Sequence, residues 1–480
     1  MRIMDRCFSA AALFVMSCVQ AFAGGDADPA FGTGGITIVD FTPITGAPGN
    51  VTNASTSVDA QGRTWGAVAV VGTSGNGIGL TRLTRNGQLD TSFGSGGRVF
   101  IPAHFGTVAS LVGIRTGLGL AFVAWTEDGI AIGSAWQACL LTESGGFDPG
   151  FFGGGCSTAV QPVTAVARDV QISPFNGNLW MVGSMPTPGS GFPEPVIAEF
   201  DLNATVVRTA SFETPGVFLD PMAGAVDANG TFYFTGAYTG ADYNTNVALD
   251  FVRDDGGVLT LWPRGAIPFD VDAYGLNLSS KADIGRCIVA PADGSILIGA
   301  SVQSGYDGIY WASARLIDSL LGPTLDPAYG TSGRTARMIA TPGWGAAADE
   351  RAIHGCFQSH DGELNMVGTY QFTDIYSQQN NQSVATYRLF ANGSPDYYFG
   401  GQFSAPGVFH SEAYDGAAFD YLRAAAEPQP RSDSGTSISP VPHTGLMIIG
   451  GVSRRTDGTA ISDLAVMRLF TDTILFSGFE

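Results

Sequence analysis

The chain has 480 residues, of which 66 are glycine and 31 phenylalanine, while only 14% are charged and the formal net charge is −20. This acidic balance, with Lys281 as the single lysine, repels phosphate backbones and argues against nucleic acid as a partner. Because glycine weakens helix interiors and aromatic side chains pack well on pleated sheets, the composition predicts an all-β protein.

The first residues have the pattern of an export signal. Arg2 and Arg6 give a positively charged start, residues 10–19 form a short apolar stretch, and Ala21-Phe22-Ala23 matches an A-x-A cleavage site. We expect residues 1–23 to be removed as a signal peptide. The mature protein is then secreted, periplasmic or bound at the cell surface.

A rival interpretation makes Val15-Met16-Ser17-Cys18 a lipoprotein box, although methionine before the serine matches that motif poorly. No later apolar run reaches the length of a membrane helix, so we expect no membrane span.

A short phrase of the form Asp-x-x-Phe-Gly recurs along the mature chain. It is usually followed by glycine and an apolar run, which predicts a tight corner that leads into a strand. The aspartates of the copies are Asp28, Asp90, Asp148, Asp326 and Asp396, and the aromatic position holds Phe31, Phe93 and Tyr329 in three of them.

These corner aspartates could in principle ring one rim and bind calcium. Calcium needs six to eight oxygen atoms close together, whereas one carboxylate in each repeat leaves neighbouring carboxylates far apart. An aspartate that caps the N–H groups of its own turn explains the repetition better. We interpret the corner residues as structural and expect neither a metal nor another cofactor.

Two further elements recur between the corners. The first is a turn, often Asn-Gly or Asp-Gly, before an apolar strand that ends in Gly or Ala; such dipeptides suit two-residue hairpins. The second is a strand typified by Thr81-Arg82-Leu83 and Met467-Arg468-Leu469. Both elements occur in seven places, and the apolar strands end at residues 72, 124, 183, 236, 299, 368 and 450.

Seven repeats of roughly 65 residues, each with about four short strands, predict one seven-bladed β-propeller over residues 24–480. We expect a monomer. The predicted units cover about 28–88, 89–146, 147–210, 211–265, 266–324, 325–394 and 395–480.

The order of these motifs resembles the delta-60 repeat family: L-D-x-x-F-G comes first, then D-G with an apolar strand, then R-L. The resemblance covers almost the whole mature chain. It implies a propeller-like, secreted or surface-associated bacterial protein. The family carries no agreed activity, so the resemblance implies nothing about chemistry.

Four cysteines remain after the signal, namely Cys139, Cys156, Cys287 and Cys356. An even number in an exported chain predicts two disulfides, and four cysteines allow three pairings. Closeness along the chain favours Cys139 with Cys156 and Cys287 with Cys356.

His354, Cys356 and His360 are separated by even numbers along one expected strand, so they should project from one face. A zinc site is conceivable there. A disulfide cysteine with two polar neighbours is the simpler interpretation, because no second group of ligands accompanies them.

No linear catalytic motif is present, and the calcium-like phrase that begins at Asp270 lacks the later ligands. A propeller can build a site around its channel from separate blades, which leaves no linear signature. Tyr370–Gln382 and Ala424–Val441 are the long insertions in which variable binding loops would be expected.

Two classes of function follow from this sequence. The first is a non-enzymatic scaffold that binds an extracellular or envelope protein or polysaccharide. The alternative is a hydrolase or lyase that acts on polysaccharide or a lactone. Five histidines and no recognisable nucleophile favour the scaffold.

The two ends of the chain look complementary. The chain begins with a corner and a strand over 36–41, whereas the last repeat lacks its corner. We expect residues 28–41 to dock beside residues 464–470, with Phe31 buried at the joint. The final phrase, 476–480, is interpreted either as an export-associated tail or as the end of the last strand.

Overall fold

The computed structural model describes residues 21–22, 27–45, 50–72, 75–104, 106–129, 133–157, 165–186, 193–203, 206–212, 218–239, 245–254, 259–267, 269, 283–304, 308–317, 322–338, 353–373, 380–396, 399, 408–410, 431–455, 462–471 and 474–475. Most of the expected export signal, the phrase that begins at Asp270 and the tail 476–480 lie outside these residues. Within them, no helix is long and apolar enough to cross a membrane.

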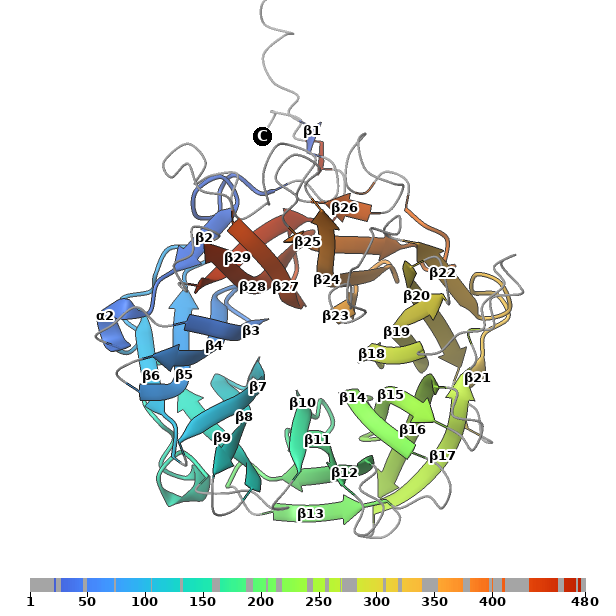
Figure 1. Cartoon of the computed structure of the whole chain (residues 1–480), viewed down its shortest axis with the longest axis horizontal. Helices are drawn as coiled ribbons and strands as arrows, with labels where there is room; N and C mark the ends of the chain where they lie inside the picture. The colour runs from blue at the N-terminus through green and yellow to red at the C-terminus, as the bar shows by residue number, and fades with distance from the viewer. Residues whose placement is uncertain are drawn as a thin grey trace, which may run out of the picture.

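The described strands form an all-β propeller, in which twisted antiparallel sheets stand side by side around a central axis (Figure 1). Five sheets are separate. The first consists of β7 (Thr107–Gly117), β8 (Leu120–Gly129) and β9 (Gly133–Thr142), and the second of β10 (Val166–Ile172), β11 (Leu179–Pro186), β12 (Pro193–Phe200) and β13 (Val206–Ser211). The third consists of β14 (Phe218–Val226), β15 (Phe232–Thr239), β16 (Thr245–Asp254) and β17 (Leu259–Ile267), and the fourth of β18 (Asp283–Val289), β19 (Ser295–Ser304), β20 (Gly308–Ile317), β21 (Thr324–Leu325) and β22 (Arg334–Met338). The fifth consists of β23 (Ile353–Gln358), β24 (Leu364–Thr373), β25 (Asn380–Leu389) and β26 (Val408–His410).

A further sheet of eight strands spans the two ends of the ring. Its strands are β27 (Arg431–Pro440), β28 (Leu446–Arg455), β29 (Ser462–Phe470), β2 (Ile36–Val39), β3 (Asn50–Val58), β4 (Thr64–Gly72), β5 (Gly75–Leu83) and β6 (Arg98–Pro102). The remaining short elements are β1 (Ala21–Phe22), which pairs with β30 (Ile474–Leu475), the helix α2 (Thr42–Thr45) and the 3₁₀ turn η1 (Phe151–Gly153).

The structure corrects the predicted number of blades. A propeller of seven separate blades is wrong, because five sheets of three to five strands stand alone as blades. The first and last predicted units are not separate sheets: a parallel pairing of Ser462 on β29 with Asn50 on β3 merges them into the eight-stranded sheet. Counting turn motifs could not reveal this merger, because it depends on one contact between the ends of the chain.

The predicted docking of the two ends is confirmed. Strand β2 pairs antiparallel with β29, Ile36 lying opposite Met467 and Val39 opposite Leu464. Phe31 is 1% exposed and packs with Val39 and Val466 in the core. The N-terminal strand therefore completes the sheet that the C-terminal strands begin.

The corner aspartates and the Arg-Leu strands, two separate motifs in the sequence, form one structural unit. The backbone N–H of Asp90 donates to the carbonyl of Arg82, while the Asp90 carboxylate pairs with the Arg82 guanidinium at 2.8 Å. That guanidinium also covers the ring of Phe93. Asp28 with Arg468 and Asp396 with Arg388 repeat this arrangement, and Asp326 pairs with Arg315 at 3.6 Å.

Four of the corner aspartates also form a hydrogen bond within their own turn. Oδ1 of Asp28, Asp90, Asp148 and Asp326 accepts a hydrogen bond from the backbone N–H two residues on, at 2.9–3.1 Å. At the Asp148 corner the residue in the place of the arginine is Leu140, whose carbonyl accepts the Asp148 N–H.

Two disulfides are present, as expected for the four cysteines. Cys139 on β9 is bonded to Cys156, which lies beyond η1. Cys287 on β18 is bonded to Cys356 on β23, and this second bond joins two separate sheets.

Candidate functional site

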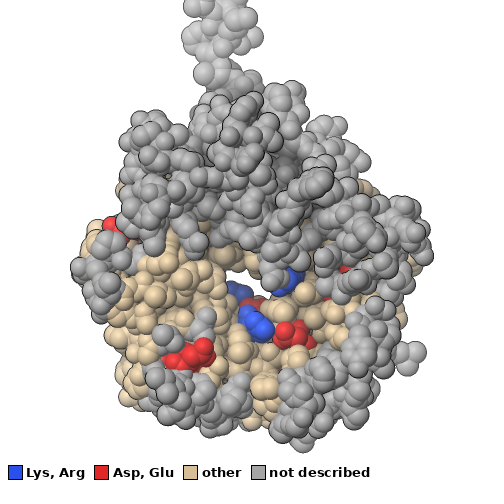
Figure 2. All heavy atoms as spheres, in the orientation of Figure 1, with Lys and Arg blue, Asp and Glu red and all other residues tan. Residues whose placement is uncertain are grey.

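A hollow lies along the propeller axis and encloses about 780 Å³, which is within the usual range of ligand sites. The strand nearest the axis in each part of the ring lines it; these strands are β3, β7, β10, β14, β18, β23 and β27. In the space-filling view, arginine atoms, drawn in blue, are visible in the central opening (Figure 2). We call this hollow the channel.

Each channel strand contains a β-bulge. The register with the neighbouring strand breaks at the same level, for example between Gly285 and Cys287 on β18 and between Ile353 and Gly355 on β23. A bulge re-aims the side chain at the break. The residues at these breaks line the channel; they are Thr52, Val112, Arg168, Met222, Arg286, His354 and Thr436.

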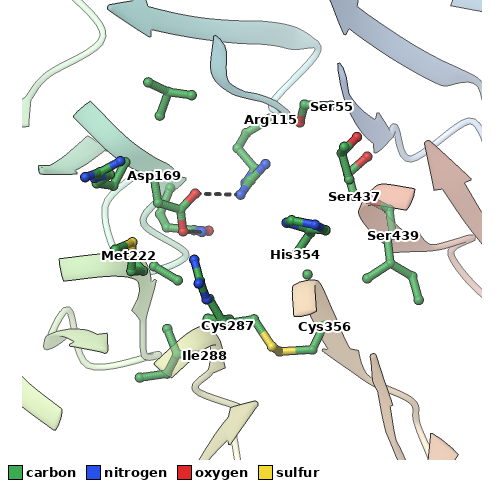
Figure 3. A pocket seen from close by; sticks show the side chains of 18 of the residues that line it. Ser55, Arg115, Asp169, Met222, Cys287, Ile288, His354, Cys356, Ser437 and Ser439 are labelled. Carbon is green, nitrogen blue, oxygen red and sulfur yellow. Dashed lines mark hydrogen bonds and ion pairs between the residues drawn. A yellow bond between two sulfur atoms is a disulfide. The ribbon is translucent and has the colours of Figure 1, made fainter. Parts of the chain in front are cut away.

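Arg115 on β7 and Asp169 on β10 form an ion pair of 2.8 Å across the junction between two sheets (Figure 3). Asp169 is buried and also accepts hydrogen bonds from the backbone N–H groups of Val170 and Gly224, at 2.7 and 2.9 Å. These contacts fix the Asp169 carboxylate, which in turn holds the Arg115 guanidinium in place.

The described part of the channel is positively charged although the chain as a whole is acidic. Arg115, Arg168 and Arg286 line it, and Arg168 approaches Asp220 on β14 at 3.4 Å. Among the described lining residues, three therefore carry a guanidinium group and one, Asp169, carries a carboxylate. A cleft lined by one sign of charge attracts ligands of the other sign, so this channel favours an anion.

His354 extends into the channel from β23, on the side facing Arg115 (Figure 3). The protein that surrounds the ring and, secondly, the positive charge of Arg286 lower the pKa of His354 to about 4. Its side chain is nevertheless exposed to the channel. At neutral pH His354 is a neutral imidazole with a nitrogen lone pair that a ligand can reach.

One wall of the channel is rich in hydroxyl groups. Strands β3 and β27 meet there, where the Ser437 hydroxyl accepts the backbone N–H of Thr56 at 2.9 Å and Ser439 donates to the Thr56 carbonyl at 3.2 Å. Ser55 and Thr436 lie on the same wall. Phe357 is the one aromatic side chain among the described lining residues, so the channel offers charge and hydroxyl groups rather than aromatic stacking.

The sequence singled out some of these residues and not others. His354 and Cys356 both line the channel, but the bulge breaks the expected alternation, and His360 lies on the exposed turn after β23 with its Nδ1 3.3 Å from Asp361. No group of three or more potential metal ligands occurs within the described part of the chain. The corner aspartates lie in turns outside the strands and are not among the residues that line the channel.

The expected binding loop at 424–441 requires a correction. Residues 431–440 form β27, an innermost strand whose hydroxyl side chains line the channel. The strand is rich in serine, threonine and glycine, a composition typical of loops, because one of its faces lines the channel. Residues 364–373 and 380–389, which flank and overlap the other expected loop, form the hairpin of β24 and β25.

Arg115, Arg168, Asp169 and Arg286 were not predicted. A positional signal exists: Arg286 and His354 each lie eight residues before the glycine of an Asp-Gly turn, at Gly294 and Gly362. A sequence does not show where a bulge lies, so only the structure reveals that this spacing places a side chain in the channel.

Comparison with known proteins gives no family. No family model and no curated protein matches the chain. Among solved structures, the chain is similar to a protein of unknown function from Dyadobacter fermentans, with 9% identity, 91% of this chain and 98% of that chain covered, and a TM-score of 0.44.

Two further structures are similar to the chain. One is a subtype N11 neuraminidase-like protein of a flat-faced bat influenza virus, with 11% identity, 79% and 99% of the two chains covered, and a TM-score of 0.41. The other is the polysaccharide lyase Uly1, with 12% identity, 76% and 91% covered, and a TM-score of 0.38. At these values the similarity carries no argument about activity.

Proposed function

We propose that the chain is an exported carbohydrate-active propeller that binds an acidic saccharide in its channel and cleaves it by β-elimination. The observation that carries the proposal is the neutral, accessible His354 beside the guanidinium group of Arg286. The two disulfides support export, because such bonds persist in oxidising compartments.

Binding follows from the charge of the channel. Carboxylates pair well with guanidinium groups, and Arg115, Arg168 and Arg286 line one hollow. The hydroxyl groups of the β3–β27 wall can exchange hydrogen bonds with sugar hydroxyls. A uronate, which has both a carboxylate and several hydroxyl groups, fits this combination.

The described channel favours elimination over two-carboxylate hydrolysis. Hydrolysis of that kind needs one carboxyl group that holds a proton and a second, ionised one. Asp169 is the one carboxylate among the described lining residues, and it is paired with Arg115, so the described lining supplies no second carboxyl group.

In the elimination, the lone pair of His354 takes the proton from the carbon next to the uronate carboxylate. The electrons of that C–H bond form the C=C double bond, the C–O bond to the leaving sugar breaks, and the leaving oxygen takes a proton from water. Guanidinium groups beside the carboxylate stabilise the negative charge that develops there. A bound carboxylate also raises the pKa of His354, which strengthens the base when substrate is present.

The test is to incubate the protein with uronate-containing polysaccharides and follow the ultraviolet absorbance of the unsaturated product. We expect absorbance to rise with the wild type and with the control variant His360→Gln, and to stay flat with His354→Gln. Binding without any rise would show that the channel binds saccharide but does not cleave it. Equal rates for His354→Gln and wild type would contradict the assigned base.

A further inference from the structure

The Cys287–Cys356 disulfide lies in the wall of the channel, next to the two residues that the proposed function uses most. Cys287 directly follows Arg286, and Cys356 lies two residues after His354 (Figure 3). The two Cα atoms are 5.8 Å apart. The bond therefore fixes how far apart the backbones that carry Arg286 and His354 can be.

We propose that this disulfide is a positioning element of the site, which holds His354 beside Arg286 across the junction of two separate sheets. The inference rests on the proposed function for its catalytic meaning. Its structural content can be tested without any saccharide.

Strands β18 and β23 belong to different sheets, so no ladder of backbone hydrogen bonds joins them. Polar contacts link channel strands at other junctions: Thr56 with Ser437 between β3 and β27, and Arg115 with Asp169 between β7 and β10. Between β18 and β23 the disulfide supplies that link. A second tie comes from β19, where the Ser301 hydroxyl accepts the N–H of Ile353 at 3.1 Å.

Strands β18 and β23 are both irregular beside the disulfide. The bulges lie between Gly285 and Cys287 and between Ile353 and Gly355. A bulge leaves its extra residue unpaired in the ladder. Arg286 and His354 occupy those extra positions, so the backbone ladder fixes them less firmly than their neighbours.

The adjoining strand β19 leaves room for the sulfur of Cys287. Gly299 on β19 lies opposite Cys287, and a Cβ atom at that position would lie only 2.5 Å from the Cys287 sulfur. Any larger residue at 299 would push the disulfide away from its place. Gly183 and Gly236 hold the same place in sheets without a disulfide, where a Cβ would meet the backbone of the bulged strand. The glycine is thus a feature of the repeat, and at 299 it leaves the space that the Cys287 sulfur occupies.

The experiment measures the pKa of His354 by NMR titration of the unliganded protein, with the histidine signals assigned by His354→Gln. The charged groups that face the imidazole are Arg286 on β18 and, on the other side of the channel, Arg115 with Asp169. The test variant is Cys287→Ser with Cys356→Ser, and the matched control is Cys139→Ser with Cys156→Ser, which removes the disulfide that does not line the channel.

We expect the pKa of His354 to rise by at least one unit in the test variant, because the histidine moves away from Arg286 and gains water. The control should leave it unchanged although it also loses stability. An unchanged pKa in a folded test variant would overturn the proposal.

If the test variant does not fold, Gly299→Ala is the second variant, because it displaces the sulfur but keeps both cysteines. Gly146→Ala, at a site with space for a Cβ, is its control. A shift in Gly299→Ala alone supports the positioning role, and no shift in either overturns it. Because saccharide is absent throughout, a protein that fails to cleave uronates would still give a clear result here.

Discussion

Arg468 and Asp28 are 440 residues apart in the chain, yet their side chains form a buried ion pair of 2.6 Å. The same guanidinium covers the ring of Phe31, 4.9 Å from its centre. The corner that the last repeat lacks is thus supplied by the start of the chain. Closing the ring removes two unpaired sheet edges, which would otherwise be open to pairing with other chains.

Phe31→Ala is expected to destabilise the whole protein. The ring of Phe31 is 1% exposed, and the loss of a buried phenylalanine typically costs about 3–5 kcal/mol of unfolding free energy. Chemical denaturation of the variant measures it. Phe175→Ala, at a residue that is 64% exposed, is the control and should change the free energy by less than about 0.5 kcal/mol. Equal effects of the two substitutions would show that closure does not depend on Phe31.

Asp90→Asn is expected to destabilise the protein at neutral pH and to matter less in acid. Burial raises the pKa of Asp90, but hydrogen bonds from Ser92 and the charge of Arg82 outweigh it and lower the pKa below 3.8. A lowered folded-state pKa gives stability that is present above pH 3.8 and is lost as the pH falls through the folded-state value. Denaturation at several pH values should therefore show a gap between wild type and variant that closes below about pH 3.8. A gap that is constant with pH would contradict the ion pair.

Removing the Cys139–Cys156 disulfide by a double serine substitution should lower the free energy of unfolding by roughly 3 kcal/mol, the value for a closed loop of about this length. The two cysteines are 17 residues apart. Thermal unfolding under non-reducing conditions measures the loss, with the reduced wild type for comparison. No difference between variant and oxidised wild type would indicate that the bond adds no stability.

The repeats and the corners could be predicted because they depend on local chemistry, and the closure could be predicted because the start of the chain holds a copy of the corner that the last repeat lacks. Asp90 and Phe93 form a turn whose residues are adjacent in sequence, and Phe31 belongs to a copy of the same motif. The number of separate blades could not be predicted, because the pairing of Ser462 with Asn50 joins the two ends of the chain. A motif count does not register a contact of that kind.

Most residues of the site could not be predicted from the sequence, for a different reason. Arg115 and Asp169 are 54 residues apart, and nothing in either strand marks them as partners. His354 and Cys356 were singled out by their spacing, but a strand of strict alternation was assumed, and the bulge after Ile353 alters it. The channel is assembled from strands that each contain at least one bulge, a feature of backbone register that residue types do not encode.

The pH dependence of cleavage should follow the protonation of the His354 imidazole. Its pKa of about 4 in the free protein means that the imidazole loses its base function when the pH falls through that value. We expect kcat/KM on a uronate polymer to be level from about pH 6 upward and to fall on the acid side near pH 4. A level profile down to pH 3, in a protein that circular dichroism shows to be folded, would rule out His354 as the base.

The most direct test of the account is the binding of an acidic oligosaccharide to the channel, measured by calorimetry at low and high salt. An oligogalacturonate is compared with a neutral galactose oligomer of the same length, using wild type, Arg286→Gln and, as a control on an outer strand, Arg98→Gln. We expect the acidic oligomer alone to bind, salt to weaken it, and Arg286→Gln to reduce its affinity about tenfold or more, in line with the loss of a charge-assisted hydrogen bond. Equal binding of both oligomers, or no effect of Arg286→Gln, would contradict an anion-binding channel.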